Sequence, residues 1–399
     1  MFQQVLSESG ARLIVLLRFD HFFKRRRRLT EIYGRRNLYP YFERETLKLR
    51  DELENQPYRD AEYYFENFRL MNDLFFHANT VKDSKSALYL EESIENLNYY
   101  SAIERLRLGC EMKSREGIFS KKYDLKTANQ DFFKDEENAL FRMFSKVIEL
   151  GDSKSDSIFF ELKEDFIKNV KTIKDEDGQR VLLSLLNFAI RQTASDEATF
   201  LKEVFILYKI GLNNQLLVKE NQITSYTFLN IVITGSKLQE FDWVQSFISK
   251  YQLNLKPKFL EDTVALGLGF LNFHKEDYEE VITILRFHDF NEILPQINAK
   301  TLLLRSYFEL LQTDSNYLEL VISVIESFEK FIRRKGFLND RRREIYLNFI
   351  VILKKLVKHS TDIQTENIET KKKELLKTLE NYKSIFAGTW LKEKILNLK

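Results

Sequence analysis

Apolar residues recur at spacings of three and four along almost the whole chain, separated by charged and polar residues. This is the period of a helix that buries one face. Two clear runs are Tyr64, Phe68, Met71, Phe75 and Leu162, Phe166, Ile167, Val170. No alternation typical of a strand persists beyond a few positions. The pattern predicts about sixteen helices, each about 12–22 residues long.

Turn-forming residues interrupt this pattern and predict where helices end. The breaks fall at residues 37–40, 55–57, 177–178, 235–236, 256–257, 294–295 and 335–336. Ser195 and the pair Thr313-Asp314 each precede an apolar run, so we expect them to cap the following helices. Elsewhere breaks are scarce, because the chain has only 12 glycines and 4 prolines against 34 phenylalanines and 18 tyrosines. Such a composition favours long helices packed face to face.

Four aromatic residues mark a loose internal repeat. Phe200, Phe241, Tyr278 and Tyr317 each stand near the start of a helix that follows a short polar turn, at separations of 41, 37 and 39 residues. Periods of this size indicate paired helices stacked into a solenoid. The length of 399 residues also exceeds the size, about 250–300 residues, at which single cores stop growing.

The third of these repeats has the most informative sequence. Gly269 lies in its first helix, where it would let two helices approach closely, while Tyr278 would wedge between them and Val281 would fill a small packing position. This segment resembles the tetratricopeptide repeat, with its Leu-Gly pair in the first helix and aromatic start of the second. The other repeats depart from the motif, since Val232 and Phe308 stand where the glycine is expected.

A wider resemblance covers much of the chain. The segments that carry it are residues 35–42 (RRNLYPYF), 53–57 (LENQP), 59–64 (RDAEYY), 102–107 (AIERLR), 110–112 (CEM), 240–244 (EFDWV) and 327–334 (SFEKFIRR). They are similar to a set of bacterial helical-repeat proteins with no assigned activity, so the resemblance implies a fold and leaves function open.

These observations predict an all-α protein, a right-handed α-solenoid of stacked antiparallel helix pairs like the tetratricopeptide proteins. We expect an N-terminal helical region at 1–120, helical repeats at 121–360 and C-terminal capping helices at 361–399. The last region contains the lysine-rich run 371–373 and Trp390.

Charge is distributed unevenly, although the net charge is only +2. Residues 1–36 carry +6, residues 331–399 carry +9, and the segment between them carries −13. Two basic clusters account for much of this, and they consist of Lys24, Arg25, Arg26, Arg27, Arg28, Arg35 and Arg36, and of Arg333, Arg334, Arg341, Arg342 and Arg343.

The two clusters have three interpretations. They are solvated helix faces that partly pair with the acidic middle of the chain, or a binding site for an acidic protein, or a binding site for nucleic acid. Arginine suits the last two, because its planar guanidinium binds phosphate and carboxylate and stacks on rings.

Catalytic chemistry finds little support. The five histidines are scattered without metal-ligand spacing, and Cys110, the only cysteine, lies in a helical run typical of a buried thiol. Gly267-Leu-Gly269 and Gly235-Ser-Lys237 lack the other glycines of phosphate-binding loops. We therefore expect no enzyme activity, no cofactor and no metal.

The sequence lacks an apolar run long enough to span a bilayer and a leader with charges ahead of its apolar run, so we expect a cytoplasmic protein without membrane contact. The leading hypothesis is a scaffold that binds a helix or extended peptide of another protein through a concave surface. That surface would carry acids of the middle segment and tyrosines such as Tyr58, Tyr89, Tyr99 and Tyr100. The alternative is an RNA- or ribosome-associated factor that uses the arginine clusters.

Overall fold

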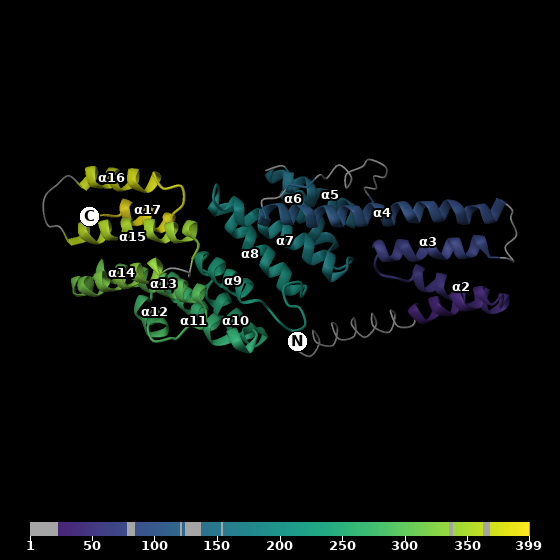
Figure 1. The fold of residues 1–399 in the computed structure, drawn as a ribbon, viewed down its shortest axis with the longest axis horizontal. Helices are drawn as coiled ribbons and strands as arrows, with labels where there is room; N and C mark the ends of the chain where they lie inside the picture. Colours follow the sequence, from purple (N-terminus) through teal and green to yellow (C-terminus); the bar gives the residue numbers. More distant parts are fainter. Residues whose placement is uncertain are drawn as a thin grey trace. The chain divides into compact units, whose positions relative to one another are not determined.

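The computed structural model describes residues 23–77, 84–119, 122–123, 137–152, 155–334, 338–361 and 368–398. Within these ranges the protein is all-helical, with seventeen α-helices, two short 3₁₀-helices and no strand beyond one isolated bridge between Lys219 and Gln222 (Figure 1). The prediction of an all-α protein is confirmed.

The chain divides into two compact units, residues 1–217 and residues 218–399. The first unit contains a helix at residues 23–35 followed by α2 (Tyr39–Glu54), α3 (Ala61–Phe76), α4 (Ser84–Phe119), α5 (Ala139–Asp152), α6 (Asp156–Asn169), α7 (Asp175–Gln192) and α8 (Glu197–Asn213). The boundaries expected near residues 120 and 360 stay predictions.

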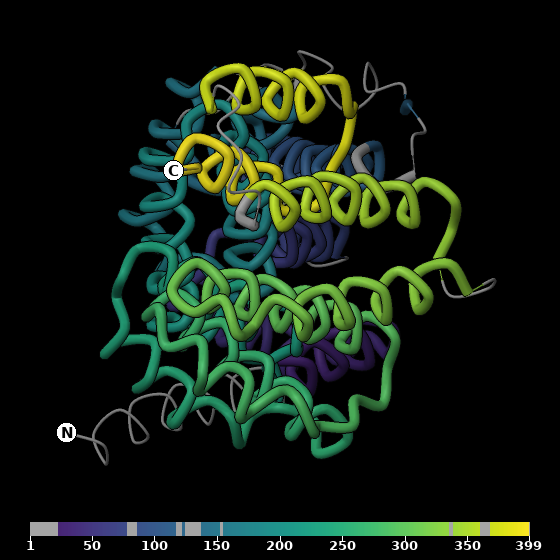
Figure 2. The backbone as a smooth tube through the Cα atoms, turned by 90° about the vertical axis from the view of Figure 1, so that its left-hand side faces the viewer, coloured from purple at the N-terminus to yellow at the C-terminus, as the bar shows by residue number. Residues whose placement is uncertain are grey.

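The second unit continues the helical succession to the end of the described chain. Its elements are α9 (Ser225–Lys237), α10 (Phe241–Tyr251), η1 (Gln252–Asn254), α11 (Pro257–His274), α12 (Tyr278–Leu285), α13 (Ile293–Leu311), η2 (Ser315–Tyr317), α14 (Leu318–Arg333), α15 (Asp340–Thr361), α16 (Ile368–Glu380) and α17 (Gly388–Leu396). The last three, yellow-green to yellow in Figure 2, pack against one another.

Side-chain caps begin several of the helices. The carboxylates of Asp60, Asp196 and Asp277 accept hydrogen bonds from backbone N–H groups three residues on, at the starts of α3, α8 and α12. The cap of α8 is therefore Asp196, and the expectation that Ser195 would fill this role is wrong, because Asp196 is the residue with non-helical backbone before the first turn.

Two expected breaks are also wrong. Gly178 lies inside the first turns of α7, and Gly235 lies near the end of α9, which continues to Lys237. A Cβ atom at Gly178 would stand 3.4 Å from Leu216, an ordinary van der Waals contact, so packing does not require a glycine at this position. The break at 335–336 lies outside the described residues.

Aromatic side chains join the helices of the first unit. Tyr64 of α3 stacks on Tyr99 of α4 with ring centroids 4.4 Å apart, and Phe65 lies 4.9 Å from Tyr100. Tyr58 is buried. The tyrosines expected to line a groove therefore pack between helices of this unit, because a half-apolar ring gains most by covering a neighbouring helix.

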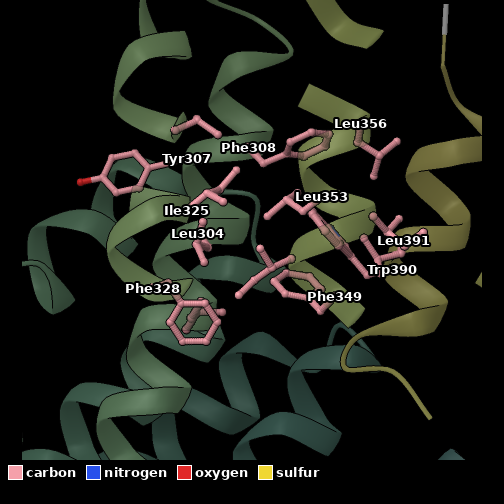
Figure 3. Close-up of a cluster of buried hydrophobic side chains, with 14 of the residues drawn as sticks. Leu304, Tyr307, Phe308, Ile325, Phe328, Phe349, Leu353, Leu356, Trp390 and Leu391 are labelled. Atoms are coloured by element: carbon pink, nitrogen blue, oxygen red, sulfur yellow. The ribbon is translucent and has the colours of Figure 1, made fainter. Parts of the chain in front are cut away.

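The core of the second unit runs from α11 to α17. Figure 3 shows Phe308 of α13, Phe328 of α14, Phe349 of α15 and Trp390 of α17 converging on one cluster of buried side chains. The Trp390 ring meets Phe308 edge-on, with centroids 5.4 Å apart. The C-terminal helices thus share one core with the helices before them.

Glycine sets the distance between helices at one point in this core. A Cβ atom on Gly269 of α11 would stand 2.9 Å from Leu285 of α12 and 3.2 Å from Leu302 of α13. Val281 is fully buried, and Tyr278 meets Phe273 at 5.5 Å. The roles expected for Gly269, Tyr278 and Val281 in helix packing are confirmed.

The contacts of Gly269 predict opposite effects for two neighbouring substitutions. Gly269→Ala should lower the free energy of unfolding by about 1–2 kcal/mol, because the added methyl overpacks a filled core. Gly267→Ala should leave it unchanged or raise it by up to about 1 kcal/mol, since alanine favours a helix and the nearest atom would lie 3.4 Å away. Urea unfolding followed by circular dichroism measures both. Equal losses from the two variants would contradict this account.

Candidate functional site

A groove of about 600 Å³ lies on the second unit, along α9, α11 and the start of α13. Its lining residues come from these three helices and from the turns that precede them. They are Lys219, Glu220, Gln222, Ile223, Thr224, Ser225, Tyr226, Leu229, Asn230, Ile233, Lys256, Phe259, Asp262, Thr263, Leu266, Phe270, Glu292, Leu294, Pro295 and Asn298.

Large apolar side chains stand exposed along this groove. Tyr226, in the first turn of α9, is 70% exposed, and Leu294, in the first turn of α13, is 37% exposed. Between them α11 contributes Phe259 and Phe270, which are half-buried. Exposed apolar side chains gathered around a concavity mark an interaction site more often than isolated ones do.

Three polar residues of the groove lining, Asp262, Thr263 and Ser225, are hydrogen-bonded within the unit. The buried carboxylate of Asp262 accepts hydrogen bonds from Nε2 of His288 at 2.9 Å and from the backbone N–H of Asn291 at 3.0 Å. The hydroxyl of Thr263 bonds that of Ser225 at 3.0 Å. These bonds fix the turn before α13 onto α11, so Asp262 holds the shape of the groove and does not present a reactive carboxylate.

The charged residues of the groove differ from the acidic lining that we expected. The lining contains three acids, Glu220, Asp262 and Glu292, and two lysines, Lys219 and Lys256, so both signs are present. Tyr226 is the single tyrosine among the lining residues. Sequence reasoning missed Tyr226 and Leu294. The available signal was an apolar residue in a first helical turn, beside the N-cap Thr224 in one case and beside Pro295 in the other.

A second cavity, of about 680 Å³, lies in the first unit between α4, α5 and α7. Four of its charged groups are paired: Arg180 lies 3.1 Å from Glu111, and Lys113 lies 3.0 Å from Glu116. Hydrogen bonds hold the pKa values of both glutamates below their usual range, so these carboxylates are ionised at neutral pH. Burial raises the pKa of the adjoining Cys110 thiol to about 12, which makes it a poor nucleophile.

Metal ligation finds no support in the part of the chain that the structure describes. It contains no group of three His, Cys, Asp or Glu side chains placed to hold an ion. Burial and the positive charge of Arg305 lower the pKa of His274 to about 4, so this imidazole is neutral at physiological pH.

Two arginines of the N-terminal basic cluster form ion pairs within the first unit. Arg27 is buried, and its guanidinium lies 2.6 Å from Asp73 and 3.4 Å from Glu66. Arg26 pairs with Glu45 and Glu52. These two arginines hold the helix at 23–35 against α2 and α3, whereas Lys24, Arg25, Arg28, Arg35 and Arg36 are exposed.

The C-terminal cluster divides in the same way. Arg333 pairs with Glu329 at 2.7 Å, and Arg343 pairs with Asp340 at 2.8 Å and donates to the carbonyl oxygen of Leu338 at 3.0 Å. Arg333 is exposed despite this ion pair, as are Arg334, Arg341 and Arg342. The structure thus confirms that part of each basic cluster serves intramolecular pairing.

Comparisons with models of protein families, with curated proteins and with solved structures found no match to this chain. The resemblance to tetratricopeptide-like bacterial proteins therefore stays a prediction. Across the described helices, none combines the length and the apolar character needed to cross a bilayer.

The pairing of Arg27 predicts a stability difference between adjacent arginines. Arg27→Gln should lower the free energy of unfolding by about 3 kcal/mol, because it strands the carboxylates of Asp73 and Glu66 in a partly buried site. Arg28→Gln, at an exposed position, should change it by no more than about 0.5 kcal/mol. Thermal and urea unfolding of the two variants test this, and equal behaviour would mean that Arg27 is not structural.

Asp177, in the first turn of α7, predicts a pH dependence. Burial and the nearby Asp60 raise its pKa to about 6, so the folded state binds this proton more tightly than the unfolded state does. The contribution of Asp177 to the free energy of unfolding therefore falls as the pH rises from about 4 through about 6. Asp177→Asn should stabilise the protein at pH 8, and its advantage should vanish near pH 4. Unfolding curves across this range measure it, and an advantage independent of pH would contradict the assignment.

Proposed function

We propose that this protein is a non-enzymatic scaffold that binds a helix or extended peptide of a partner protein in the groove of α9, α11 and α13. The observation that supports the proposal is the row of apolar side chains along this groove, from Tyr226 through Phe259 and Phe270 to Leu294. The occupant is a segment with large apolar side chains, because these fill such a concavity with the greatest gain from burial.

We further propose that the helices from α9 to α14 form a short solenoid of the tetratricopeptide type. Successive first helices are in contact, α9 with α11 and α11 with α13, and each also contacts the helix that follows it. Short connections between the members of a pair favour antiparallel packing. In such an arrangement one layer of helices presents a continuous surface to a ligand.

The chain's own C-terminal helices leave this groove open. All lining residues belong to the segment from Lys219 to Asn298. Trp390 of α17 packs instead on Phe308 and Phe349, toward the second half of α13. A groove filled by the protein's own chain would have argued against a binding role.

The exposed face of the helix at 23–35 supports an alternative function. Arg25, Arg28, Arg35 and Arg36 are exposed, and the spacing of three and seven residues places the first three on one side of the helix. Such a face suits RNA or a ribosomal surface, and binding there would weaken steeply with salt.

One capture experiment distinguishes the two proposals. Tagged wild-type protein, Tyr226→Ala/Leu294→Ser and the control Leu253→Ser are used to capture partners from the native lysate, with and without nuclease, and quantified by mass spectrometry. Leu253 is 81% exposed but does not line the groove. We expect one partner protein that is captured in equal amount with and without nuclease. The captured amount should fall at least about tenfold with the groove variant and stay unchanged with the control, since two apolar anchors are each worth about 1–2 kcal/mol.

Other outcomes favour the alternative or neither proposal. The alternative is supported if the captured partners are lost after nuclease treatment and are also lost with the variant Arg25→Gln/Arg28→Gln/Arg35→Gln/Arg36→Gln. The exposed basic face of the helix at 23–35 would then be the binding site. Arg27 is kept in that variant because it is buried in ion pairs. Partners insensitive to both sets of substitutions would contradict both proposals.

A further inference from the structure

Helix α4 carries an apolar stripe that stays exposed among the described residues of the first unit. Leu90, Ile94, Leu97 and Leu108 are 36%, 63%, 40% and 51% exposed. The stripe follows alternating spacings of four and three residues, so its positions lie on one side of the helix. These positions are 90, 94, 97, 101, 104 and 108. The stripe is about 27 Å long at 1.5 Å per residue. Ser101 and Glu104 interrupt it.

The helix's intramolecular contacts lie on a different side. The hydroxyl of Ser93 bonds Asn72 of α3 at 2.7 Å, Tyr99 stacks on Tyr64 of α3, and Cys110 reaches the backbone of Phe144 of α5. The stripe therefore lies beside α3 along the free edge of α4, which is the longest helix in Figure 1.

Exposed charges beside the stripe differ between its two halves. Glu91 and Glu95 flank the first half, and no lysine or arginine occurs between residues 86 and 104. Arg105 and Arg107 flank the second half, where Arg107 forms an ion pair with Glu104 of the stripe at 2.6 Å. Because Glu104 offsets Arg107, the charge difference along the stripe is that of Glu91 and Glu95 against Arg105, and it is complementary to a second copy only when the two helices run antiparallel.

We propose that the α4 stripe is the interface of a two-fold symmetric dimer, in which α4 packs antiparallel against α4 of a second copy. A two-fold axis near Asn98 places Leu90 opposite Leu108 of the second copy and Leu97 opposite Ser101. The same axis brings Glu91 toward Arg105 of the second copy, and each contact occurs twice, as an isologous interface requires.

The same pattern disfavours other arrangements. A parallel pair would place Glu91 beside Glu91 and Arg105 beside Arg105, which repel one another. Ser101 and Glu104 within the stripe reduce the apolar area, and Glu104 faces Ile94 of the second copy in the antiparallel register. The dimer should therefore be weak, with a dissociation constant in the micromolar range.

The first test is sedimentation velocity of the full chain over a concentration series. The wild type should dimerise reversibly, and Ile94→Glu should weaken the dimer at least about tenfold, equivalent to 1.4 kcal/mol. Leu88→Ser is the matched control, because Leu88 is 52% exposed on another side of α4. It should leave the dimer unchanged. Circular dichroism verifies that each variant is folded.

Charge exchange tests the antiparallel register itself. Glu91→Arg and Arg105→Glu should each weaken the dimer, since each places like charges together. The double variant should restore it, because the pairing is then reversed on both sides. A structural defect in α4 would not be repaired in this way.

Cross-linking tests the position of the axis. Asn98→Cys introduces an exposed thiol, while Cys110 is buried and does not compete. A short bismaleimide should link two Asn98→Cys chains and leave Leu88→Cys chains unlinked. A chain that stays monomeric at high concentration, a dimer indifferent to Ile94→Glu, or a double charge variant without recovery would each overturn the proposal.

Discussion

The buried cluster around Glu309 is the interaction on which the C-terminal end of the second unit depends. Its carboxylate accepts a hydrogen bond from Nε1 of Trp390 at 2.7 Å and pairs with Lys394 at 2.8 Å. Arg305 lies between the rings of Phe273 and Trp390, and burial lowers its pKa to about 10, which leaves it charged at neutral pH. These contacts join α11, α13 and α17. Removing one charge would strand the others in the core.

Periodicity was sufficient to predict the fold class, because a spacing of three and four over most of the chain is incompatible with strands. It also identified the helix starts at Phe241 and Tyr278 and the close approach at Gly269, where a backbone constraint leaves a direct trace in the sequence. It failed at Gly178, because a glycine in a first helical turn can continue the helix: its backbone N–H donates to the carbonyl oxygen of Lys174 at 2.9 Å.

The groove was less predictable than the fold. Its lining combines residues from three helices whose faces are set by tertiary packing, and half-buried aromatics look alike in a sequence whether they cover a neighbour or a cavity. Tyr99 and Tyr226 illustrate this: the first stacks on Tyr64 within the unit, and the second stands 70% exposed beside the groove. Likewise, no spacing rule separated the buried Arg27 from the exposed Arg28.

Site-specific photo-cross-linking tests the central claim, that the groove of α9, α11 and α13 binds a partner peptide. A photoreactive phenylalanine analogue is placed at position 226 in the groove, or at position 253 outside it, and irradiated in the native lysate. The account predicts cross-links from position 226 to one short segment of one protein, rich in apolar residues, and none to it from position 253. Cross-links of equal yield and identity from both positions would contradict it.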